Sequence, residues 1–454
     1  MDYEAQKRLH LDNMNIDFDK SFESYNPGNN HHIITVYLLK QDNLICPHCA
    51  NNKILVRGSK TQIINYSSVL EDNLFIHLHR RIFKCKLCGK YFYEDNPFCD
   101  EGKQNSIYRE YKILQALKDL NATYTSVAKR FNVSPTYVSN LFDKRINLSR
   151  LKLPKILCVD EVYSKKLSFH HYCFILYSPR DRKIIDVLDS RHSDSLEEYF
   201  SKIPMEERDN VEFFSSDLYE PYRKIAKKFF PKAKICADPF HVIKNISSCV
   251  HAVRIDTMKR YSYLKNSNDN YYWLFKSFWK LIMRDPSNLS HKKFKLNKTG
   301  QYLSQVEIVE YMLKISPKLD LVYKLYHDYR NFNYMATLDN VISWFDSVII
   351  DYQSSELQEL IPAWKLMINW HDEIVNSFNK VDGIRISNGP MERANRDIKT
   401  IFRLSFGSTN FKRMRNRIMY VMNSDSPILY SPQEKTNKNV GKERGKYNKH
   451  KKIK

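Results

Sequence analysis

Two short apolar runs that each end in an aspartate stand out in residues 213–245, FFSSDLYEPYRKIAKKFFPKAKICADPFHVIKN. The first run ends at Asp217, a segment with helical spacing follows, and the second run ends at Asp238, with His241 three residues later. In open α/β sheets, functional groups lie beyond the carboxyl ends of the strands. The pattern therefore predicts an α/β active site, although two aspartates that cap helices would also explain it.

The strands before this stretch extend the sheet. Residues 156–161, ILCVDE, are typical of a buried strand that ends in carboxylates, and two further apolar strands flank the turn Ser-Pro-Arg-Asp-Arg. The resulting order is strand, strand, strand, helix, strand, helix, strand, helix, which is the order of a ribonuclease-H-like domain. Because the first and fourth strands of that domain are neighbours, we expect Asp160 and Asp217 to lie side by side.

A helix late in the chain supplies a third acid. The helix is expected to begin near Asn388 or Ser387, with Pro390 in its first turn. One face of this helix carries an acid and several polar or basic groups at helical spacing: Glu392, Asn395, Arg396, Lys399 and, further on, Arg403. A solvated helix face is the competing interpretation.

The three acids Asp160, Asp217 and Glu392 are the candidate catalytic residues. Mg²⁺ prefers carboxylate oxygens, and two ions about 3.5–4 Å apart can activate the attacking oxygen and stabilise the leaving oxygen in phosphodiester displacement. We therefore expect Mg²⁺ or Mn²⁺ as the cofactor of these acids. Asp238 and His241 are an accessory pair, and an exchange of roles between Asp217 and Asp238 remains open.

Two C-x-x-C pairs, Cys46 with Cys49 and Cys85 with Cys88, predict a zinc ribbon. Each pair lets one tight turn present two sulfurs to the same ion, and four thiolates suit tetrahedral Zn²⁺. The 35 residues between the pairs exceed the usual gap, and we expect strands to occupy them. Cys99 and His48 are possible substitute ligands. With four ligands the zinc would be structural.

Residues 125–142 fit a helix-turn-helix. The apolar positions recur at helical spacing, Asn132 suits the turn, and Ser134 with Pro135 is typical of a helix start. The second helix would present four polar side chains to the major groove of DNA: Thr136, Tyr137, Asn140 and Lys144.

The net charge of +22 implies a polyanionic partner, for which nucleic acid is the default. An anionic membrane surface is the competing partner, but no apolar run approaches the roughly 18–20 residues that span a bilayer. Because the N-terminus lacks the layout of a secretory signal, we expect a cytoplasmic protein without membrane attachment.

The fold class that follows is multidomain α+β, with an α/β catalytic domain interrupted by an all-helical insertion. The aromatic-rich residues 247–385 form this insertion, since aromatics at helical spacing usually belong to a core. The predicted divisions are an N-terminal segment (1–30), zinc ribbon (31–100), helix-turn-helix (101–150), first part of the catalytic core (151–246), helical insertion (247–385), C-terminal core helices (386–425) and basic disordered tail (426–454).

Several motifs together resemble the ISL-three family of bacterial insertion-sequence transposases: CPHC with CKLCGKYF, VDEVY, SDLYEPY, FPKAKICADPFHVIKN and NGPMERANRDIKTIFRLSFGSTNFKRMRNRI. The resemblance implies a zinc ribbon, a helix-turn-helix and a DDE catalytic domain. It also implies that Asp160, Asp217 and Glu392 are the triad, and that Asp238 and His241 match a D-x-x-H signature shared with Mutator-like and hAT transposases.

The activity that the resemblance implies is DNA cleavage and strand transfer at terminal inverted repeats. The partners would be the double-stranded DNA of the repeats and of the target, bound by a homodimer in a bacterial cytoplasm, at the nucleoid. One alternative is a catalytically inactive or domesticated DNA-binding regulator. Another is a nuclease of the same fold that cuts without joining.

Overall fold

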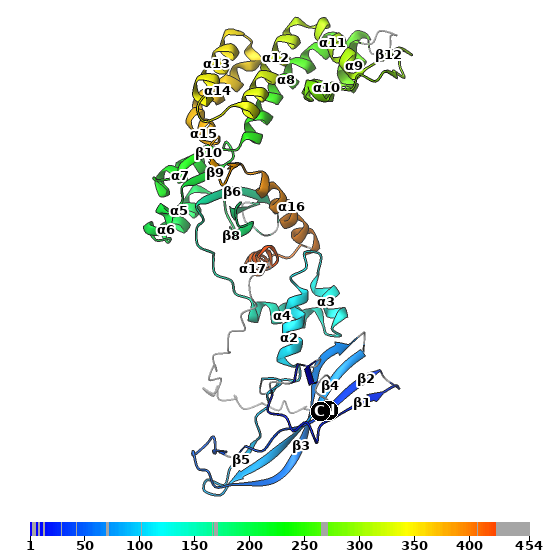
Figure 1. Cartoon of the computed structure of the whole chain (residues 1–454), viewed down its shortest axis with the longest axis vertical. Coiled ribbons are helices and arrows are strands. Elements are labelled where there is room, and N and C mark those ends of the chain that lie inside the picture. The colour runs from blue at the N-terminus through cyan, green and yellow to red at the C-terminus, as the bar shows by residue number, and fades with distance from the viewer. Residues whose placement is uncertain are drawn as a thin grey trace, which may run out of the picture. The chain divides into compact units, whose positions relative to one another are not determined.

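The computed structural model of the chain describes residues 1–423 except 2–5, 8–9, 12–13, 29, 42, 70–71, 101, 166, 168–170, 265–270 and 406. Residues 1–147 and residues 148–423 form two separate compact units, whose elements are labelled in Figure 1. The basic tail expected at 426–454 lies outside the described residues.

A long antiparallel hairpin forms the centre of the first unit. Its strands are β3 (Ile54–Val69) and β4 (Asp72–Cys85), and the pairing shifts between Val56 and Gly58. Gly58 has φ 146°, a backbone conformation that side chains disfavour, so glycine suits this irregularity. The other edge of β4 pairs with two strands, β2 (His31–Tyr37) in parallel orientation and β5 (Tyr91–Tyr93) in antiparallel orientation. β1 (Phe22–Asn26) then pairs with β2. Part of the predicted N-terminal segment thus belongs to this sheet.

Three helices follow the sheet in the first unit: α2 (Ile107–Ala116), α3 (Tyr124–Arg130) and α4 (Pro135–Arg145). The side chain of Ser134 caps α4 by accepting a hydrogen bond from the amide of Tyr137, as expected from the sequence. Asn132 takes a positive φ of 48° in the turn between α3 and α4. Most of the apolar positions of this stretch are buried: Val127, Ala128, Phe131, Val138 and Leu141.

A five-stranded sheet of order β10-β9-β6-β7-β8 forms the core of the second unit. β6 pairs in antiparallel with β7, and β7 with β8, whereas β6, β9 and β10 run parallel to one another. The predicted adjacency of the first and fourth strands is confirmed. The strands are β6 (Ile156–Tyr163), β7 (Tyr172–Ser178), β8 (Lys183–Leu188), β9 (Phe213–Ser216) and β10 (Lys234–Ala237).

Helices cover both faces of this sheet (Figure 1). One face packs on α5 (Ser193–Ser201) and α7 (Glu220–Phe229), next to the short α6 (Met205–Asp209), and alternate strand residues such as Leu157, Val159 and Phe174 belong to this core. The other face packs on α16 (Gly389–Leu404), which contacts β6, and on α17 (Phe411–Met422), which contacts β8. Because strand residues alternate between faces, consecutive residues of β6 meet different helices.

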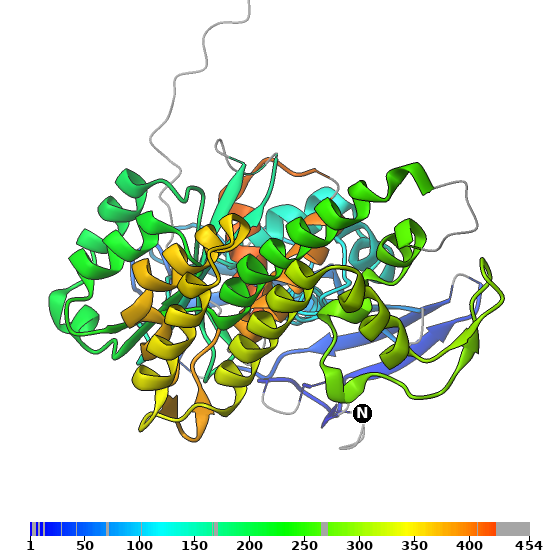
Figure 2. The ribbon, with the colours of Figure 1, turned by 90° about the horizontal axis from the view of Figure 1, so that it is seen from above.

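A helical insertion joins β10 to α16. It begins at α8 (Pro239–Arg260), before the expected boundary at residue 247, and its helices pack through the large core that contains Val250, Phe332 and Phe345 (Figures 1 and 2). The longer helices after α8 are α11 (Gln305–Ile315), α12 (Pro317–Met335), α13 (Val341–Ser354) and α14 (Ile361–Asn369). Shorter elements complete it: α9 (Tyr271–Ser277), α10 (Trp279–Met283), β11 (Phe294–Lys295), β12 (Tyr302–Leu303) and α15 (His371–Asn376), followed by the hairpin of β13 (Lys380–Val381) and β14 (Ile384–Arg385).

The insertion is fastened to the sheet where it returns. α15 packs against β10, and the side chain of Asn376 donates a hydrogen bond to the carbonyl of Ile235 (3.1 Å). Arg223 on α7 lies over the ring of Trp370 (4.3 Å) and donates to the carbonyl of Asn369 (2.6 Å). None of the helices in the described part of the chain is both long and apolar enough to cross a membrane.

Candidate active site and metal centre

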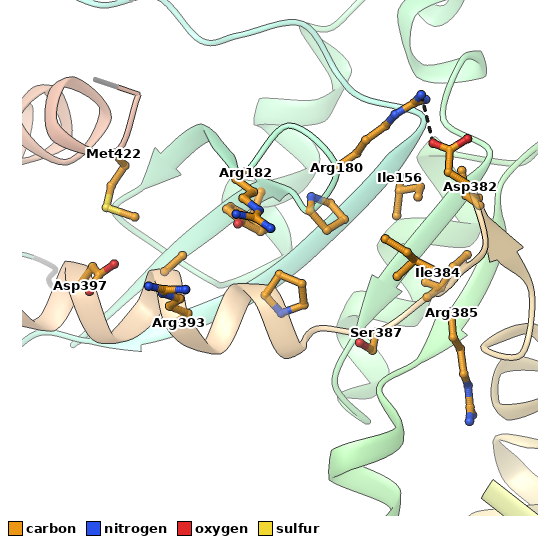
Figure 3. A pocket seen from close by; sticks show the side chains of 16 residues that line it. Ile156, Arg180, Arg182, Asp382, Ile384, Arg385, Ser387, Arg393, Asp397 and Met422 are labelled. Carbon is orange, nitrogen blue, oxygen red and sulfur yellow. Dashed lines mark ion pairs between the residues drawn. The ribbon is translucent and has the colours of Figure 1, made fainter. Parts of the chain in front are cut away.

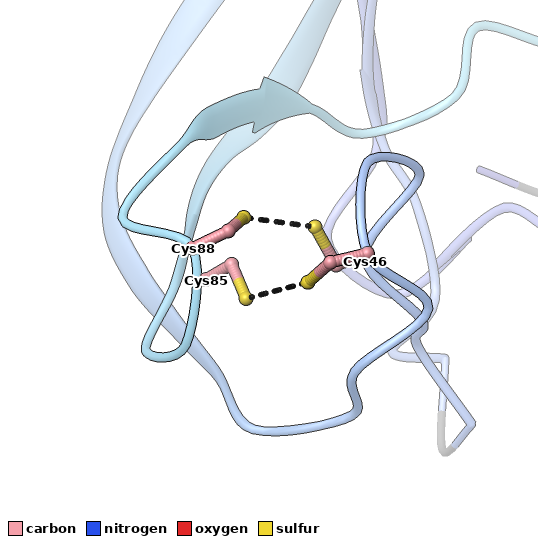
Figure 4. A group of neighbouring side chains, drawn as sticks. Cys46, Cys85 and Cys88 are labelled. Carbon is pink, nitrogen blue, oxygen red and sulfur yellow. Dashed lines mark hydrogen bonds between the residues drawn. The ribbon is translucent and has the colours of Figure 1, made fainter.

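The four predicted zinc ligands come together in the first unit. The Sγ atoms of Cys46, Cys49, Cys85 and Cys88 all lie within 4.8 Å of one another, and the sulfurs of the two loops face each other at 3.6 and 3.7 Å (Figure 4). Hydrogen bonding from the backbone at Cys88 and Leu87 lowers the pKa of the Cys85 thiol to about 7, whereas burial and hydrogen bonds to the other three sulfurs raise the pKa of Cys49 to about 12.

The arrangement fits a tetrahedral Zn²⁺ held by two knuckles. Cys99 is not part of it, because its sulfur donates to the carbonyl of Lys103 (3.2 Å) and accepts from Asn96 (3.1 Å). His48 is also outside the four-residue group. Four sulfurs leave no open coordination position, so a zinc ion here would hold the fold together and would not react.

Asp160 in β6 and the residues that follow β9 and β10 bring three aspartates to one edge of the second sheet, although β6 continues past the expected strand end at Glu161 to Tyr163 by pairing with β7. The parallel pairing of Cys158 with Ser215 is followed two residues later by Asp160 and Asp217. Similarly, Ala237 pairs with Ser216, and the next residues are Asp238 and Asp217. Asp217 and Asp238 thus follow the last residues of β9 and β10, and Asp160 lies in β6 two residues beyond its last parallel pair with β9, which is the strand between the other two.

Burial and mutual repulsion disfavour the charged forms of these acids. Burial raises the pKa of Asp160 to about 6, and the neighbouring Glu161 adds to the effect. Burial, Glu161 and Asp160, in that order, raise the pKa of Asp217 to about 7. In the described part of the chain, the four cysteines are the only group of three or more side chains gathered closely enough to hold a metal ion, and the acids do not form such a group.

The start of α16 is fastened to the same edge. The backbone amide of Asn388 donates to Oδ1 of Asp238 (3.2 Å), and its side chain donates to the carbonyl of Val159 (3.2 Å). Asn388 occupies the N-cap position as expected, but its side chain bonds β6 and does not cap the helix. Further along α16, Asn395 donates to Oδ2 of Asp160 (2.7 Å).

The residues predicted on one face of α16 are divided by burial. Asn395 is buried against Asp160, whereas Glu392 is exposed in the first turn. Glu392 interacts electrostatically with Asp238 and raises its pKa. The exposed face continues at helical spacing with three cations: Arg396, Lys399 and Arg403.

Asp238 and His241, the predicted accessory pair, are close to each other and influence the electrostatics of the acidic edge. His241 Nε2 lies 3.9 Å from Asp238 Oδ2, and Asp238 is buried while His241 is partly exposed. Burial raises the pKa of Asp238, and His241 acts in the opposite direction on both Asp238 and Asp160. Asp217 thus interacts with Asp160, and Asp238 interacts with Glu392.

A set of contacts that the sequence did not reveal holds Glu161 away from Asp160. Glu161 follows Asp160 in β6 and so faces the opposite side of the sheet, where it pairs with Arg191 (2.7 Å) and accepts from the hydroxyl of Tyr222 (2.6 Å). Arg191 also lies over the ring of Tyr172 (4.1 Å). Strand alternation alone distinguishes the two neighbouring acids.

The four residues predicted to contact DNA from α4 differ in exposure. Thr136, Asn140 and Lys144 are exposed on one face, while Tyr137 is half-buried and its hydroxyl lies 3.4 Å from Glu110. Glu110 in turn pairs with Arg145 (2.7 Å). Tyr137 therefore contributes to packing between α2 and α4 in this structure.

A cavity of about 510 Å³ lies beside α16, between the β7–β8 turn and the β13–β14 hairpin (Figure 3). Its wall is mostly apolar, with Arg182 and Arg393 among its charged residues and an ion pair between Arg180 and Asp382 (3.0 Å). None of the three candidate catalytic acids lines it. The acidic edge is thus distinct from this cavity.

Comparison with known proteins agrees with the arrangement of the second unit. A protein of *Methanobrevibacter smithii* named "Insertion element ISM1 uncharacterized 48.3 kDa protein" is 24% identical over 227 residues, which are 46% of this chain and 53% of that protein. The chain thus matches about half the length of this relative. The family model of the ISL-three DDE transposases, described as "Transposase", matches residues 157–418, which is more than half of the chain and includes all the strands and helices around the acidic edge. The chain belongs to this family of transposases.

Proposed function

We propose that the chain is a DNA transposase that binds the terminal inverted repeats of an insertion sequence and cleaves and joins DNA strands at the acidic edge. The parallel pairing of β6 with β9, which ends two residues before Asp160 and Asp217, carries this proposal. The strand order β10-β9-β6-β7-β8 supports a ribonuclease-H-like core, since the first strand lies between the second and the fourth in that fold.

The donor set fits a divalent cation such as Mg²⁺ or Mn²⁺. Oδ1 of Asp217 and Oδ1 of Asn395 are buried oxygen atoms without a hydrogen-bond partner, and oxygen is the ligand atom that these ions prefer. A cation would also offset the repulsion that raises the pKa values of Asp160 and Asp217. Asp160, Asp217 and Glu392 are the residues that would hold it, with Asn395 orienting Asp160.

Mg²⁺, when bound, would supply Lewis-acid stabilisation of the oxygens that attack and leave phosphorus. The protein residues have separate parts in this reaction. Asp160 is fixed by the amide of Glu161 (2.8 Å) and by Asn395, so its oxygens keep one orientation. Glu392 lies on the rigid α16, whose exposed cations Arg396, Lys399 and Arg403 would hold the DNA backbone.

We favour Asp217 over Asp238 as the second acid because the charge of Asp160 contributes, after burial and Glu161, to the raised pKa of Asp217, while Asp238 accepts the amide of Asn388 and supports the start of α16. Asp238 and His241 would then orient the site. The helices α3 and α4 would form the helix-turn-helix that contacts the repeats, with Thr136, Asn140 and Lys144 toward the major groove and Tyr137 beside them. Pairing of two element ends would require a homodimer on DNA.

The test is nicking of duplex DNA that contains the repeats flanking the gene, with Mg²⁺ or Mn²⁺. We expect Asp217→Ala to abolish 3′-end cleavage while DNA binding is retained. Asp397→Ala is the matched control, because Asp397 lies on α16 but lines the separate cavity. Normal cleavage by Asp217→Ala would remove Asp217 from the triad, and absence of nicking by the unmodified protein would favour a regulator without catalysis. A strand-transfer assay distinguishes the transposase from a nuclease.

A further inference from the structure

A second pocket in the first unit has a different chemistry from the metal sites. It has a volume of about 480 Å³ and lies between the β3–β4 hairpin and residues 102–104. Three cationic side chains line it, Lys60, Arg80 and Lys103, together with the ring of Tyr93 and the amides of Gln62 and Gln104. No carboxylate lines it, so its ligand is expected to be an anion with hydrogen-bonding groups and a flat face.

The strand register explains why these groups share one face. Arg80, Ile82 and Lys84 alternate on β4, and the pairing partners of these residues are Lys60, Tyr93 and Tyr91. Glu94, which follows Tyr93, is buried and directs its carboxylate to Arg81 on the opposite face. The positive charge of the Tyr93 face is therefore not neutralised by Glu94.

Two exposed aromatic rings stand beside the pocket. Tyr91 and Tyr93 are 57% and 48% exposed, and each has a cation near its ring: Lys84 at 5.3 Å from Tyr91 and Arg80 at 5.5 Å from Tyr93. Residues two apart on a strand are separated by about 6.6 Å. This distance is about twice the 3.4 Å rise between bases along one strand of a duplex, so two bases that stack on these rings would be unstacked from each other.

We propose that this pocket and the two tyrosines form a binding site for single-stranded DNA. The rings of Tyr91 and Tyr93 stack on successive unpaired bases, and Lys60 and Lys103 hold the phosphates. Arg80, whose guanidinium donates to the carbonyl of Glu94 (2.7 Å) and to Oε1 of Gln62 (2.9 Å), adds positive charge to the pocket. A duplex does not fit this surface as well, because its bases present no free faces.

The site also continues toward α4. Lys103 and Gln104 line both this pocket and a smaller one of about 270 Å³, whose wall includes Asn140 and Lys144 and also Glu110, which pairs with Arg145 (2.7 Å). A strand bound on the tyrosines can thus pass along residues 103–104 to the helix that we expect to contact duplex DNA. The inference does not rest on strand transfer by the acidic edge, which belongs to the other unit.

The test uses the zinc-loaded full chain and fluorescence anisotropy with two probes, a 12-nucleotide oligothymidine and a 12-base-pair hairpin duplex. Tyr93→Ala should weaken binding of the oligothymidine about tenfold, within the range for loss of one base–aromatic stack, and leave the duplex within twofold. Tyr93→Phe should bind like the unmodified protein, because the ring and not the hydroxyl makes the stack. Tyr25→Ala, a similarly exposed tyrosine on β1 of the same sheet, is the control and should change neither affinity.

The contribution of the two lysines to oligothymidine binding is measured separately, through the salt dependence of the affinity. Lys60→Ala combined with Lys103→Ala should reduce the slope of log affinity against log salt for the oligothymidine by about 1.4, because each phosphate contact to a single strand contributes about 0.7. Bound zinc, measured for each variant, verifies that the sheet is intact. Unchanged oligothymidine binding by Tyr93→Ala, or an equal loss on the duplex, overturns the proposal.

Discussion

The cysteine cluster and the acidic edge both gather potential metal ligands, yet they do so in opposite ways. The four sulfurs lie within 4.8 Å of one another and come from two short turns next to a hairpin. The acids come from β6, the end of β9 and α16, and in the described residues they do not form a group of this kind. Thiols can approach one another as neutral groups, whereas ionised carboxylates repel one another. We therefore expect the first site to be closed and structural, and we propose that the second is open and suited to a reaction.

The largest expected effect is loss of zinc from the closed site. Cys85→Ser should remove the bound metal and unfold the first unit, because structural zinc contributes about 10–16 kcal/mol to the folding of small zinc domains. Zinc content by mass spectrometry and limited proteolysis would measure it. Cys99→Ser should keep its zinc, since Cys99 bonds Lys103 and Asn96 instead. A Cys85→Ser protein with normal zinc content would contradict the assignment.

Substitution at the acidic edge should have the opposite effect on stability: removing an acid is expected to stabilise the metal-free protein. The folded-state pKa of Asp217, about 7, is above its unfolded value, so ionising it costs free energy of folding as the pH rises from about 4 to 7. Asp217→Asn should therefore increase the free energy of unfolding by a few kcal/mol at pH 8, at about 1.4 kcal/mol per pKa unit. Near pH 4 the difference should vanish.

Denaturant unfolding in the presence of a chelator for Mg²⁺ measures this effect. Asp397→Asn on the same unit is the control and should show no comparable gain at pH 8. An Asp217→Asn protein that is less stable than the unmodified chain at pH 8 would mean that Asp217 is not repelled by Asp160 and Glu161.

Asn395 tests how the acidic edge is organised, because it is not an acid itself but donates the hydrogen bond that positions Asp160. Asn395→Ala removes the donor to Asp160 and should raise the Mg²⁺ concentration needed for half-maximal cleavage by about 10- to 100-fold, as loss of such outer contacts does at other metal sites. Excess Mg²⁺ should restore much of the activity, which would not occur for Asp160→Ala. A loss that Mg²⁺ cannot restore would show that Asn395 acts in another way.

The smallest effect concerns Glu161, the acid that faces away from Asp160. Arg191→Lys keeps the charge near Glu161 but loses the planar stacking on Tyr172, so the free energy of unfolding should fall by about 1 kcal/mol. Cleavage by the folded variant should remain near that of the unmodified protein. A large loss of cleavage with unchanged stability would instead assign Glu161 to the reaction.

The sequence predicted the cysteine cluster more completely than the acidic edge. Residues close together in the chain determine much of the cluster, whereas contacts between distant residues determine parts of the edge. The C-x-x-C spacing encodes the position of two sulfurs within one turn, so the four cysteines that cluster in the structure were all identified from the sequence. The strand that contains Asp160 and the strand that precedes Asp217 were also identifiable, because apolar runs of this length bounded by polar residues are typical of buried strands, but the first of them continues to Tyr163 and does not end at its acids.

The contacts that the sequence did not reveal join distant parts of the chain. Asn395 was placed on the helix face of Glu392, but only the packing of α16 on β6 determines that it is buried against Asp160. Asn388 was expected to cap α16, and its side chain bonds Val159 instead. The opposite orientation of Glu161 follows from strand alternation and could have been predicted. The cationic pocket around Tyr93 depends on residues 102–104 returning to the hairpin, which no local pattern indicates.

The hydrogen bond between Asp238 and Asn388 affects how the five-stranded sheet tolerates changes in the length of the helical insertion. The helical insertion starts at Pro239, directly after Asp238, and the chain returns to α16 at Asn388, so the two junctions of the insertion are held together by one contact of 3.2 Å. The free-energy cost of closing a loop between fixed ends grows slowly, by about 0.6 kcal/mol for each doubling of its length. The core can therefore accept inserted segments of very different size at this point, and the insertion is a natural place for exchange of modules by recombination or by protein engineering.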